Sequence, residues 1–377
     1  MSALAVAGLS ARVMAEAAAA DGFDVIALDL FGDADTKRAS SQWLPIGEPA
    51  GMRIEPARVL SALQALARRG GVIGWVAGGG FEGLPDLLEQ GAAVLPLLGT
   101  GPRAVRRVRD QAEFFGYLDA RGIAHPEVQQ ARPLDTTGWL LKDAGGCGGW
   151  HIRHASAQVG KEAPRGHYFQ HEMAGTPMSA TFVANGHDAC LLGFNQLIVR
   201  RRGSRPFVYG GVVGPVPLPT GVSAHLTAAL SALVAGFSLR GLGSLDFVLD
   251  GDHAGVLEVN PRPPASLFLY GRCVDHGVMR AHVNACLRGE LPLRVSRPQG
   301  VCGTEVVFAR RTMMLSEQAA LGLAARPGVH DLPAGAMAFE AGDPVCSVQA
   351  SGAHGDQVIQ QLEAARDALL QELETTT

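Results

Sequence analysis

Residues 242–264 (LGSLDFVLDGDHAGVLEVNPRPP) constrain the fold most strongly, because they have the pattern of a β-hairpin with acidic residues inside apolar strands. Asp246 interrupts the first strand and Glu258 interrupts the second. Asn260 follows Glu258 by two residues, so both side chains point to the same face of the strand. The segment 261–264 (PRPP) ends the second strand, because proline cannot donate a hydrogen bond to the ladder.

Two interpretations of this hairpin remain open. Carboxylate and amide oxygens from Asp246, Glu258 and Asn260 suit Mg²⁺ or Mn²⁺, and Mg²⁺ takes few protein ligands while keeping phosphate and water for the rest. Arg262, just beyond, would then clamp a phosphate or a developing oxyanion. The alternative is a tight structural hairpin whose two buried acids pair with arginines.

Composition sets the frame for these motifs. A chain of 377 residues with 47% hydrophobic residues predicts two or three globular domains, and a net charge of −4 gives no general reason to expect nucleic acid. The six cysteines form no C-x-x-C pair, which argues against a zinc ribbon and favours reduced thiols in the cytoplasm. No apolar run reaches the ~20 residues of a membrane helix, and the alanine-rich start lacks the basic segment of a signal peptide.

The first 98 residues alternate between apolar runs and helical patterns. We expect strands at 3–8, 23–30 and 71–77 and a helix at 56–69, which together predict βαβ units around a parallel sheet. The alternation therefore predicts an α/β domain at the start of the chain.

A glycine-rich turn follows the strand at 71–77 and contains Gly78, Gly80 and Gly83 in a formal G-x-G-x-x-G pattern. A dinucleotide fingerprint requires an acidic residue about 20 residues later, at the end of the next strand, and the predicted strand 92–99 (AAVLPLLG) has none there. The fingerprint is therefore the weakest of three interpretations, and the other two are close packing at a strand end and a substrate crevice to which Glu82 contributes.

A second informative stretch, residues 137–154 (TGWLLKDAGGCGGWHIRH), follows a predicted arginine-rich helix at 102–122. It predicts a strand carrying Lys142, a flexible loop and a further strand at 150–154. Glycines in such a loop let backbone N–H groups close over phosphates, although a mobile hairpin tip explains the composition equally well. The loop is no Walker A motif, because G-K-[ST] before a helix is absent.

Three motifs together resemble the ATP-grasp superfamily: Lys142 with its glycine loop, the segment 168–175 (YFQHEMAG), and the hairpin SLDF…LEVNPR. The resemblance implies an α/β chain, α+β in its grasp domain, with a three-part ATP-grasp architecture. Its parts are a Rossmann-like pre-grasp domain (1–98), the ATP-grasp domain (99–300) and a small C-terminal closing domain (301–377).

The resemblance also implies roles for individual residues and two ligands, ATP and Mg²⁺ (or Mn²⁺). Two residues are implied as catalytic, Lys142 on the α/β-phosphates and Arg262 at the transition state that forms an acylphosphate. The others bind nucleotide or metal: Gly145, Gly146, Gly148 and Gly149 over the β/γ-phosphates, Gln170, His171, Glu172 and Met173 at the adenine hinge, and Asp246, Glu258 and Asn260 around one or two metal ions.

One departure from the family pattern affects the first nucleotide contact. Many relatives begin the grasp domain with Asp-Lys, whereas this chain has Asp110-Gln111 at the matching place. Arg107 and Arg109 are the candidate replacements, and an arginine fork binds phosphate differently from an ammonium group.

Within the superfamily the chain most resembles a biotin-carboxylase-related group of predicted ATP-dependent carboxylate–amine ligases. Members occur beside one-carbon pathways that use tetrahydromethanopterin- and methanofuran-type coenzymes. The resemblance implies amide formation through an acylphosphate, joining glutamate or a similar amino acid to a coenzyme precursor of the methylofuran or methanopterin type.

Two other functions stay open, an ATP-grasp carboxylase or kinase-like enzyme and a non-catalytic nucleotide-binding regulator. The expected partners are a small-molecule carboxylate and an amine, with no nucleic acid and no membrane, and dimers are common in the superfamily. We expect substrate contacts from loops and strand segments at 9–12, 31–36, 78–83, 195–202 and 209–211.

Overall fold

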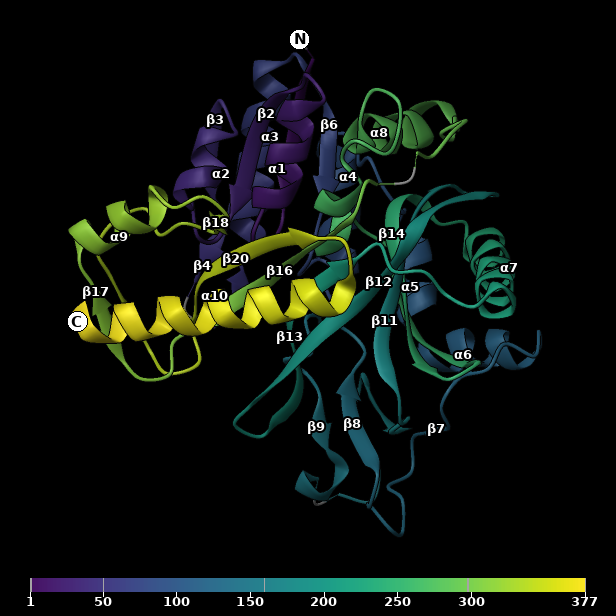
Figure 1. Cartoon of the computed structure of the whole chain (residues 1–377). Coiled ribbons are helices and arrows are strands. Elements are labelled where there is room, and N and C mark those ends of the chain that lie inside the picture. Colours follow the sequence, from purple (N-terminus) through teal and green to yellow (C-terminus); the bar gives the residue numbers. More distant parts are fainter. Residues whose placement is uncertain (1, 50, 159, 297, 377) are drawn as a thin grey trace.

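The computed structural model describes residues 2–49, 51–158, 160–296 and 298–376. A parallel sheet forms the N-terminal part, a long antiparallel sheet forms the centre, and the C-terminal helix lies across that second sheet (Figure 1). The helices are α1 (Arg12–Ala20), α2 (Ala34–Arg38), α3 (Pro56–Arg69), α4 (Pro85–Val94), α5 (Pro102–Arg109), α6 (Gln111–Asp119), α7 (Thr220–Phe237), α8 (Val278–Arg288), α9 (Glu317–Ala324) and α10 (Gly355–Thr376), with 3-10 turns η1 (Ala155–Ala157) and η2 (Ala265–Tyr270).

The strands form three larger sheets and two short two-stranded ones, β17–β19 and β4–β5. The strands are β1 (Ala3–Ala7), β2 (Asp24–Asp29), β3 (Gln42–Pro45), β4 (Gly47–Glu48), β5 (Arg53–Ile54), β6 (Val72–Ala77), β7 (Val128–Gln129), β8 (Trp139–Asp143), β9 (Arg153–His154), β10 (His167–His171), β11 (Thr176–Asn185), β12 (Ala189–Arg202), β13 (Arg205–Gly214), β14 (Arg240–Asp250), β15 (His253–Asn260), β16 (Val301–Phe308), β17 (Met313–Leu315), β18 (Val329–His330), β19 (Met337–Phe339) and β20 (Pro344–Gly352).

The N-terminal sheet is parallel, in the order β3-β2-β1-β6, as the βαβ pattern predicted. Every residue of β1 is buried, which fits a parallel sheet covered on both faces. The predicted strand at 92–99 was wrong: helix α4 continues to Val94, and only Leu97 makes an isolated parallel bridge, to Trp75. Pro96 separates the helix from that bridge and cannot donate to a ladder.

The predicted single helix at 102–122 was also wrong, because the chain breaks at Asp110 into α5 and α6. Asp110 adopts an extended conformation, and its carboxylate accepts a hydrogen bond from the backbone N–H of Glu113 at 2.9 Å. This is an N-cap, which starts a new helix in place of the continued one. The strand predicted at 150–154 shrinks to the two residues of β9.

The central sheet has eight strands in the order β15-β14-β11-β12-β13-β16-β20-β18. Strand β13 pairs with β16, so the sheet runs without interruption from the segment predicted as the grasp domain into the one predicted as the closing domain. The predicted hairpin at 242–264 is confirmed as β14 and β15, joined by a two-residue turn.

Helix α7 is long and apolar enough, by length and composition, to cross a membrane. In the fold one face of it packs against β12 and β15 and contributes to a core shared with α6. Its buried residues recur at helical spacing: Val222, Leu226, Ala229, Leu230, Leu233, Val234 and Phe237. Such a stripe is typical of a core helix, and each fully buried leucine or phenylalanine stabilises by about 1.5–3 kcal/mol.

Asp21 connects the N-terminal sheet region to helix α8, which lies far along the chain. Its carboxylate accepts hydrogen bonds from the backbone N–H groups of Met279 (2.7 Å) and Arg280 (2.9 Å), at the start of α8. These N–H groups have no partner inside the helix, so the carboxylate acts as a cap supplied from another segment.

We predict that Asp21→Ala lowers the free energy of unfolding by about 1 kcal/mol, as loss of a helix cap does. Chemical denaturation followed by circular dichroism measures the change. Asp24→Ala, three residues further along, is the matched control and should stay within about 0.5 kcal/mol of wild type. Equal effects of the two substitutions would contradict the capping role.

Candidate nucleotide and metal site

The hairpin register places the two acidic residues directly opposite each other. Asp246 on β14 pairs with Glu258 on β15, and Ser244 pairs with Asn260, with a register shift just after Asp246. Like charges opposite each other on neighbouring strands destabilise a sheet, so this pair needs compensation. Burial raises the pKa of Asp246 to about 7, and the neighbouring Glu258 carboxylate adds to the shift.

Asn260 bridges the carboxylates to the arginines around them. Its side-chain Nδ2 donates to Asp246 Oδ2 at 2.9 Å and to Glu258 Oε1 at 3.5 Å. Its Oδ1 accepts from Arg109 Nη2 at 3.1 Å and from Arg262 Nη2 at 3.5 Å. The amide therefore turns its nitrogen toward the carboxylates, and an Asn260 that binds a metal there must rotate its oxygen to that side.

Arg109 is the arginine that enters the site. It ends α5, and its side chain is 9% exposed, with Nη1 donating to Glu258 Oε2 at 3.2 Å. Arg107 points elsewhere: it pairs with Glu113 and donates to the Gly236 carbonyl. Of the two candidates for the missing lysine, the structure brings only Arg109 to the predicted metal ligands. Its Nε is buried and has no partner among the residues described.

Glu82, from the glycine-rich turn after β6, organises both arginines. Its Oε1 accepts from Arg262 Nε at 2.7 Å and lies 3.8 Å from Arg109 Nη2, while Oε2 accepts from the N–H of Gly80 at 2.7 Å. Burial acts to raise the pKa of Glu82, but Arg262 and then Arg109 hold it below its usual range. The turn therefore supplies a charged residue to the site, in line with the crevice interpretation.

Lys142 lies on β8 and is 4% exposed, with its Nζ donating to Gln170 Oε1 at 2.7 Å. Burial lowers the pKa of this lysine, although Glu258 and Asp246 act in the opposite direction. Gln170, on the neighbouring strand β10, keeps its Nε2 buried and without a partner in the described part of the chain. An unsatisfied buried amide next to a buried ammonium group marks a place where a polar ligand completes the hydrogen bonding.

The glycine loop lies folded onto the central sheet. Gly148 accepts a hydrogen bond from the N–H of Tyr209 on β13 at 2.9 Å, and a Cβ at Gly149 would lie 1.7 Å from the carbonyl oxygen of Phe207. Gly148 and Gly149 line the main cavity. Gly145 and Gly146 lie outside that lining, where Gly145 packs on Gly83 and a Cβ at Gly146 would collide with the His151 ring.

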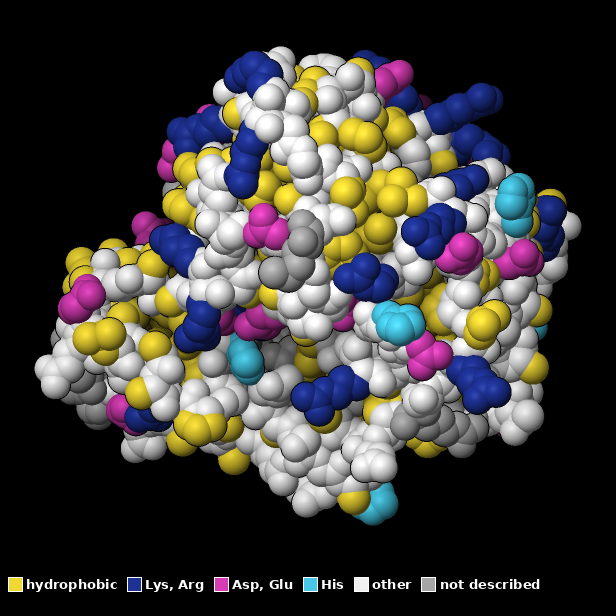
Figure 2. All heavy atoms as spheres, turned by 90° about the horizontal axis from the view of Figure 1, so that it is seen from above, with side chains coloured by type: hydrophobic (Ala, Val, Ile, Leu, Met, Phe, Trp, Pro, Cys, Tyr) yellow, Lys and Arg dark blue, Asp and Glu magenta, His cyan; other side chains and the backbone are white. Residues whose placement is uncertain are grey.

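A single cavity of about 690 Å³ joins these parts, within the usual size of a ligand pocket. Its wall includes the predicted hinge, residues 170–173, but the N–H groups of His171 and Glu172 already donate to the carbonyls of Glu127 and Gly138. Seen from above, the surface is hollowed near its middle, and basic, acidic and histidine side chains are interspersed around the hollow (Figure 2).

The residues present fit a divalent cation. Two carboxylates opposite each other, one with a pKa raised to about 7, form an oxygen-rich site in which a dication relieves their repulsion. The alternative interpretation, acids paired with arginines, describes part of the same network. Glu258 is paired with Arg109, and Arg109 with Lys142 holds its pKa below the usual range although burial acts to raise it.

Sequence reasoning missed two residues of this site. Ser244 donates from its hydroxyl to Asp246 Oδ1 at 3.0 Å, a contact that its register opposite Asn260 could have indicated. His151 lies two residues after Gly149, lines the cavity, and keeps a buried Nδ1 without a partner in the described structure. Burial lowers the pKa of His151.

Comparison with known proteins agrees with this geometry. Residues 108–266 match the model of a family described as an ATP-grasp domain. Among curated proteins the chain is similar to the carbamoyl phosphate synthase large chain of Kocuria rhizophila, 24% identical over a 266-residue alignment that covers 64% of this chain and 24% of that protein. The same protein of Paenarthrobacter aurescens is 26% identical over a 227-residue alignment that covers 54% of this chain and 20% of that protein. The chain thus spans a quarter or less of the length of these relatives.

Solved structures share the fold over nearly the whole chain. N5-carboxyaminoimidazole ribonucleotide synthetase from Thermotoga maritima matches with a TM-score of 0.64 at 13% identity, covering 97% of this chain and 98% of that one. Biotin carboxylase from Campylobacter jejuni matches with a TM-score of 0.69 at 12% identity, covering 98% of this chain and 95% of that one. L-amino acid ligase from Bacillus licheniformis matches with a TM-score of 0.67 at 14% identity, covering 100% of this chain and 97% of that one. The predicted mixed α/β ATP-grasp fold is confirmed.

The raised pKa of Asp246 leads to a prediction about stability. The folded state keeps this proton up to about pH 7, whereas an aspartate in the unfolded chain releases it near pH 3.8, so its contribution to stability is lost as pH rises between these values. In EDTA, we expect Asp246→Asn to melt at a higher temperature than wild type at pH 8, with a smaller difference at pH 5. Asp250→Asn, exposed at the end of the same strand, is the control. A difference that does not change with pH would show that Asp246 titrates normally.

Proposed function

We propose that the protein is an ATP-dependent carboxylate–amine ligase that works through an acylphosphate. One observation carries the proposal: the Asp246–Glu258–Asn260 group, Arg262 and Lys142 border a single cavity that also reaches the loops predicted to bind substrates. A binding protein that only senses nucleotide has no need for a paired-carboxylate metal site facing an arginine.

The proposed chemistry follows from charge. A substrate carboxylate attacks the γ-phosphorus of ATP, the bond to the β-phosphate oxygen breaks, and ADP leaves. An amine nitrogen then attacks the acyl carbon, loses a proton and expels inorganic phosphate. Asp246, Glu258 and Asn260 would hold Mg²⁺, which would offset the repulsion between the two anions.

The chain's own residues have separate parts in this proposal. The ammonium of Lys142 binds phosphate oxygens, because its hydrogen bond to Gln170 fixes it at the cavity wall. Arg262, oriented by Glu82, stabilises charge on the transferring group. Folding of the glycine loop onto Phe207 and Tyr209 excludes water from an acylphosphate that would otherwise hydrolyse.

The finer assignment rests on the family resemblance. It names glutamate or a similar amino acid and an amine precursor of a methylofuran- or methanopterin-type coenzyme as the substrates. The proposal also includes a cytoplasmic location and a homodimer, with neither nucleic acid nor membrane as a partner.

A second candidate is an ATP-grasp carboxylase, in which bicarbonate takes the place of the carboxylate substrate. Similarity of fold to biotin carboxylase and to N5-carboxyaminoimidazole ribonucleotide synthetase favours it. The two candidates share the phosphorylation step and differ in the acid that is activated.

The test is Mg²⁺-dependent release of ADP and phosphate from ATP, with glutamate or bicarbonate as the acid and a panel of amines that includes tyramine and pterin precursors. We expect amine-stimulated ADP release in wild type and a fall of about 100- to 1000-fold in Glu258→Gln, which removes one charge but keeps the side-chain volume. Glu89→Gln, on the exposed side of α4, is the control and should keep full activity.

The pattern of stimulation separates the candidates. Glutamate-dependent turnover that yields an amide would support the ligase function. Bicarbonate-dependent turnover would instead support the carboxylase function. Tight binding of Mg-ATP, with no pair of acid and amine stimulating ADP release, would favour a nucleotide-binding regulator. Failure to bind ATP would exclude all three.

A further inference from the structure

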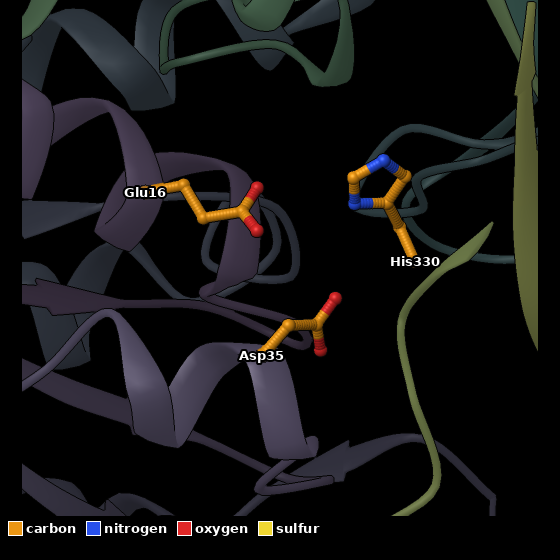
Figure 3. A group of neighbouring side chains, drawn as sticks. All are labelled: Glu16, Asp35 and His330. Atoms are coloured by element: carbon orange, nitrogen blue, oxygen red, sulfur yellow. The ribbon is translucent and has the colours of Figure 1, made fainter. Parts of the chain in front are cut away.

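A second polar group comes from elements outside the predicted nucleotide site, and two of its three residues, Glu16 and His330, line the same cavity. Glu16 lies on α1, Asp35 on α2 and His330 on β18. Their side chains point toward one another across a small gap, from the N-terminal sheet region on one side and the C-terminal segment on the other (Figure 3). One ligand atom from each lies within 4.8 Å of the other two.

All three side chains present hydrogen-bond acceptors. His330 Nε2 donates to Gln349 Oε1 at 3.0 Å, because an amide oxygen only accepts. In the neutral imidazole Nδ1 then keeps a lone pair, and Nδ1 is the ring nitrogen that faces the two carboxylates (Figure 3). Asp35 is 1% exposed and is fixed by the backbone N–H groups of Asp331 (2.8 Å) and Leu332 (3.1 Å).

The group carries an excess of negative charge. Arg12 supplies positive charge, with Nη1 at 2.9 Å from Glu16 and Nε at 2.6 Å from Asp331 and 3.7 Å from Asp35. Three carboxylates therefore share one guanidinium. Burial, together with the charges of Asp331, Asp29 and Asp35, raises the pKa of nearby Asp33 to about 8.

A further atom of the cavity wall lacks a partner. The hydroxyl of Tyr209, on β13, is buried and makes no hydrogen bond to any residue that the structure describes. Glu16 and His330 line the same cavity as Tyr209, and so do Asp246 and Asn260. A ligand that reaches from the second polar group to the predicted metal ligands would therefore have this hydroxyl in the wall of its cavity.

We propose that Glu16, Asp35 and His330 form a subsite for a primary ammonium group of the substrate. An ammonium group has three N–H donors, and three hydrogen bonds of about 2.9 Å at tetrahedral angles place their acceptors about 4.7 Å apart. Apolar side chains in the wall of the same cavity, those of Leu9, Val13, Val199 and Val306, favour a substrate with an apolar body. This inference rests on the proposed ligase function, and the ammonium belongs either to an amino-acid substrate or to an amine.

A divalent metal fits the same three ligands less well. The Arg12 guanidinium already contacts Glu16 and lies close to Asp35, so an added dication would face a neighbouring positive charge. A monovalent ammonium meets half that repulsion and leaves the lone pairs used by Arg12 in place.

The experiment measures binding without turnover, by isothermal titration or ligand-observed NMR on the full chain. Two matched pairs serve as probes, hexylamine with 1-hexanol and L-norleucine with hexanoate. We expect an ammonium probe to bind about 10-fold or more tightly than its neutral or carboxylate-only partner. The pair that shows the larger difference identifies whether the amine or the amino acid occupies the subsite.

Three variants locate the effect. Glu16→Gln should weaken binding of the ammonium probe about 10-fold and leave binding of 1-hexanol unchanged. Tyr209→Phe should weaken binding of the ammonium probe by a smaller factor. Glu89→Gln is the control, with the same chemical change on α4, and should match wild type. Melting temperature and affinity for ATP, measured alongside, show that each variant is folded.

Equal binding of ammonium and neutral probes, or an unchanged affinity in Glu16→Gln, would overturn the subsite. Binding of ZnCl₂ or MnCl₂ that is lost in His330→Ala, without selectivity for ammonium, would replace it with a metal site. The proposed ligase is tested separately by Glu258→Gln. Turnover lost in that variant together with unselective probes would leave the ligase intact and overturn the subsite alone.

Discussion

The repulsion between two carboxylates that face each other on neighbouring strands governs the arrangement of this site. Asp246 and Glu258 are fixed by the register of a two-residue hairpin, so they cannot move apart without breaking the ladder. Three positive groups compensate, and each comes from a different part of the chain: Arg109 from the end of α5, Lys142 from β8, and Arg262 from the segment that leaves β15. The site therefore forms only when these segments have converged.

Glu82 connects this compensation to the N-terminal sheet. It lies in the turn after β6 and pairs with Arg262 while remaining within 3.8 Å of Arg109. Without this carboxylate, two guanidinium groups that share the Asn260 oxygen would repel each other in a buried space. Glu82 of this turn thus orients Arg262 and Arg109. This explains why a glycine-rich segment without a dinucleotide fingerprint still borders the site.

Patterns within short stretches of sequence predicted the elements whose structure depends mainly on neighbouring residues. The hairpin, helix α3 over residues 56–69 and the parallel N-terminal sheet follow from alternation, periodicity and proline positions that are visible in a short window. The strand predicted at 92–99 failed because a short apolar run fits a buried helix end as well as a strand. The single helix predicted at 102–122 failed because Asp110 prefers to cap a new helix.

Asp246, Glu258 and Asn260 share one hairpin, so their proximity follows from register alone. The subsite of Glu16, Asp35 and His330 joins positions about 300 residues apart, which no spacing rule brings together, and only the docking of the loop after β18 onto α2 creates it.

Arg109, in place of the lysine expected from the resemblance, would change the electrostatics of the proposed metal site as well as the proposed phosphate contact. A lysine ammonium is a single point charge on a flexible stem, whereas the arginine fork donates to Glu258 and Asn260 at the same time. In that geometry the Arg109 guanidinium neutralises Glu258, one of the predicted metal ligands. It also keeps the Asn260 oxygen turned away from the carboxylates. In the proposed ligase a dication would therefore compete with Arg109 for Glu258, and phosphate oxygens of a bound nucleotide would be the acceptors best able to draw the guanidinium away. Arg109 would then couple the binding of metal to the binding of nucleotide, since each would remove the obstacle to the other.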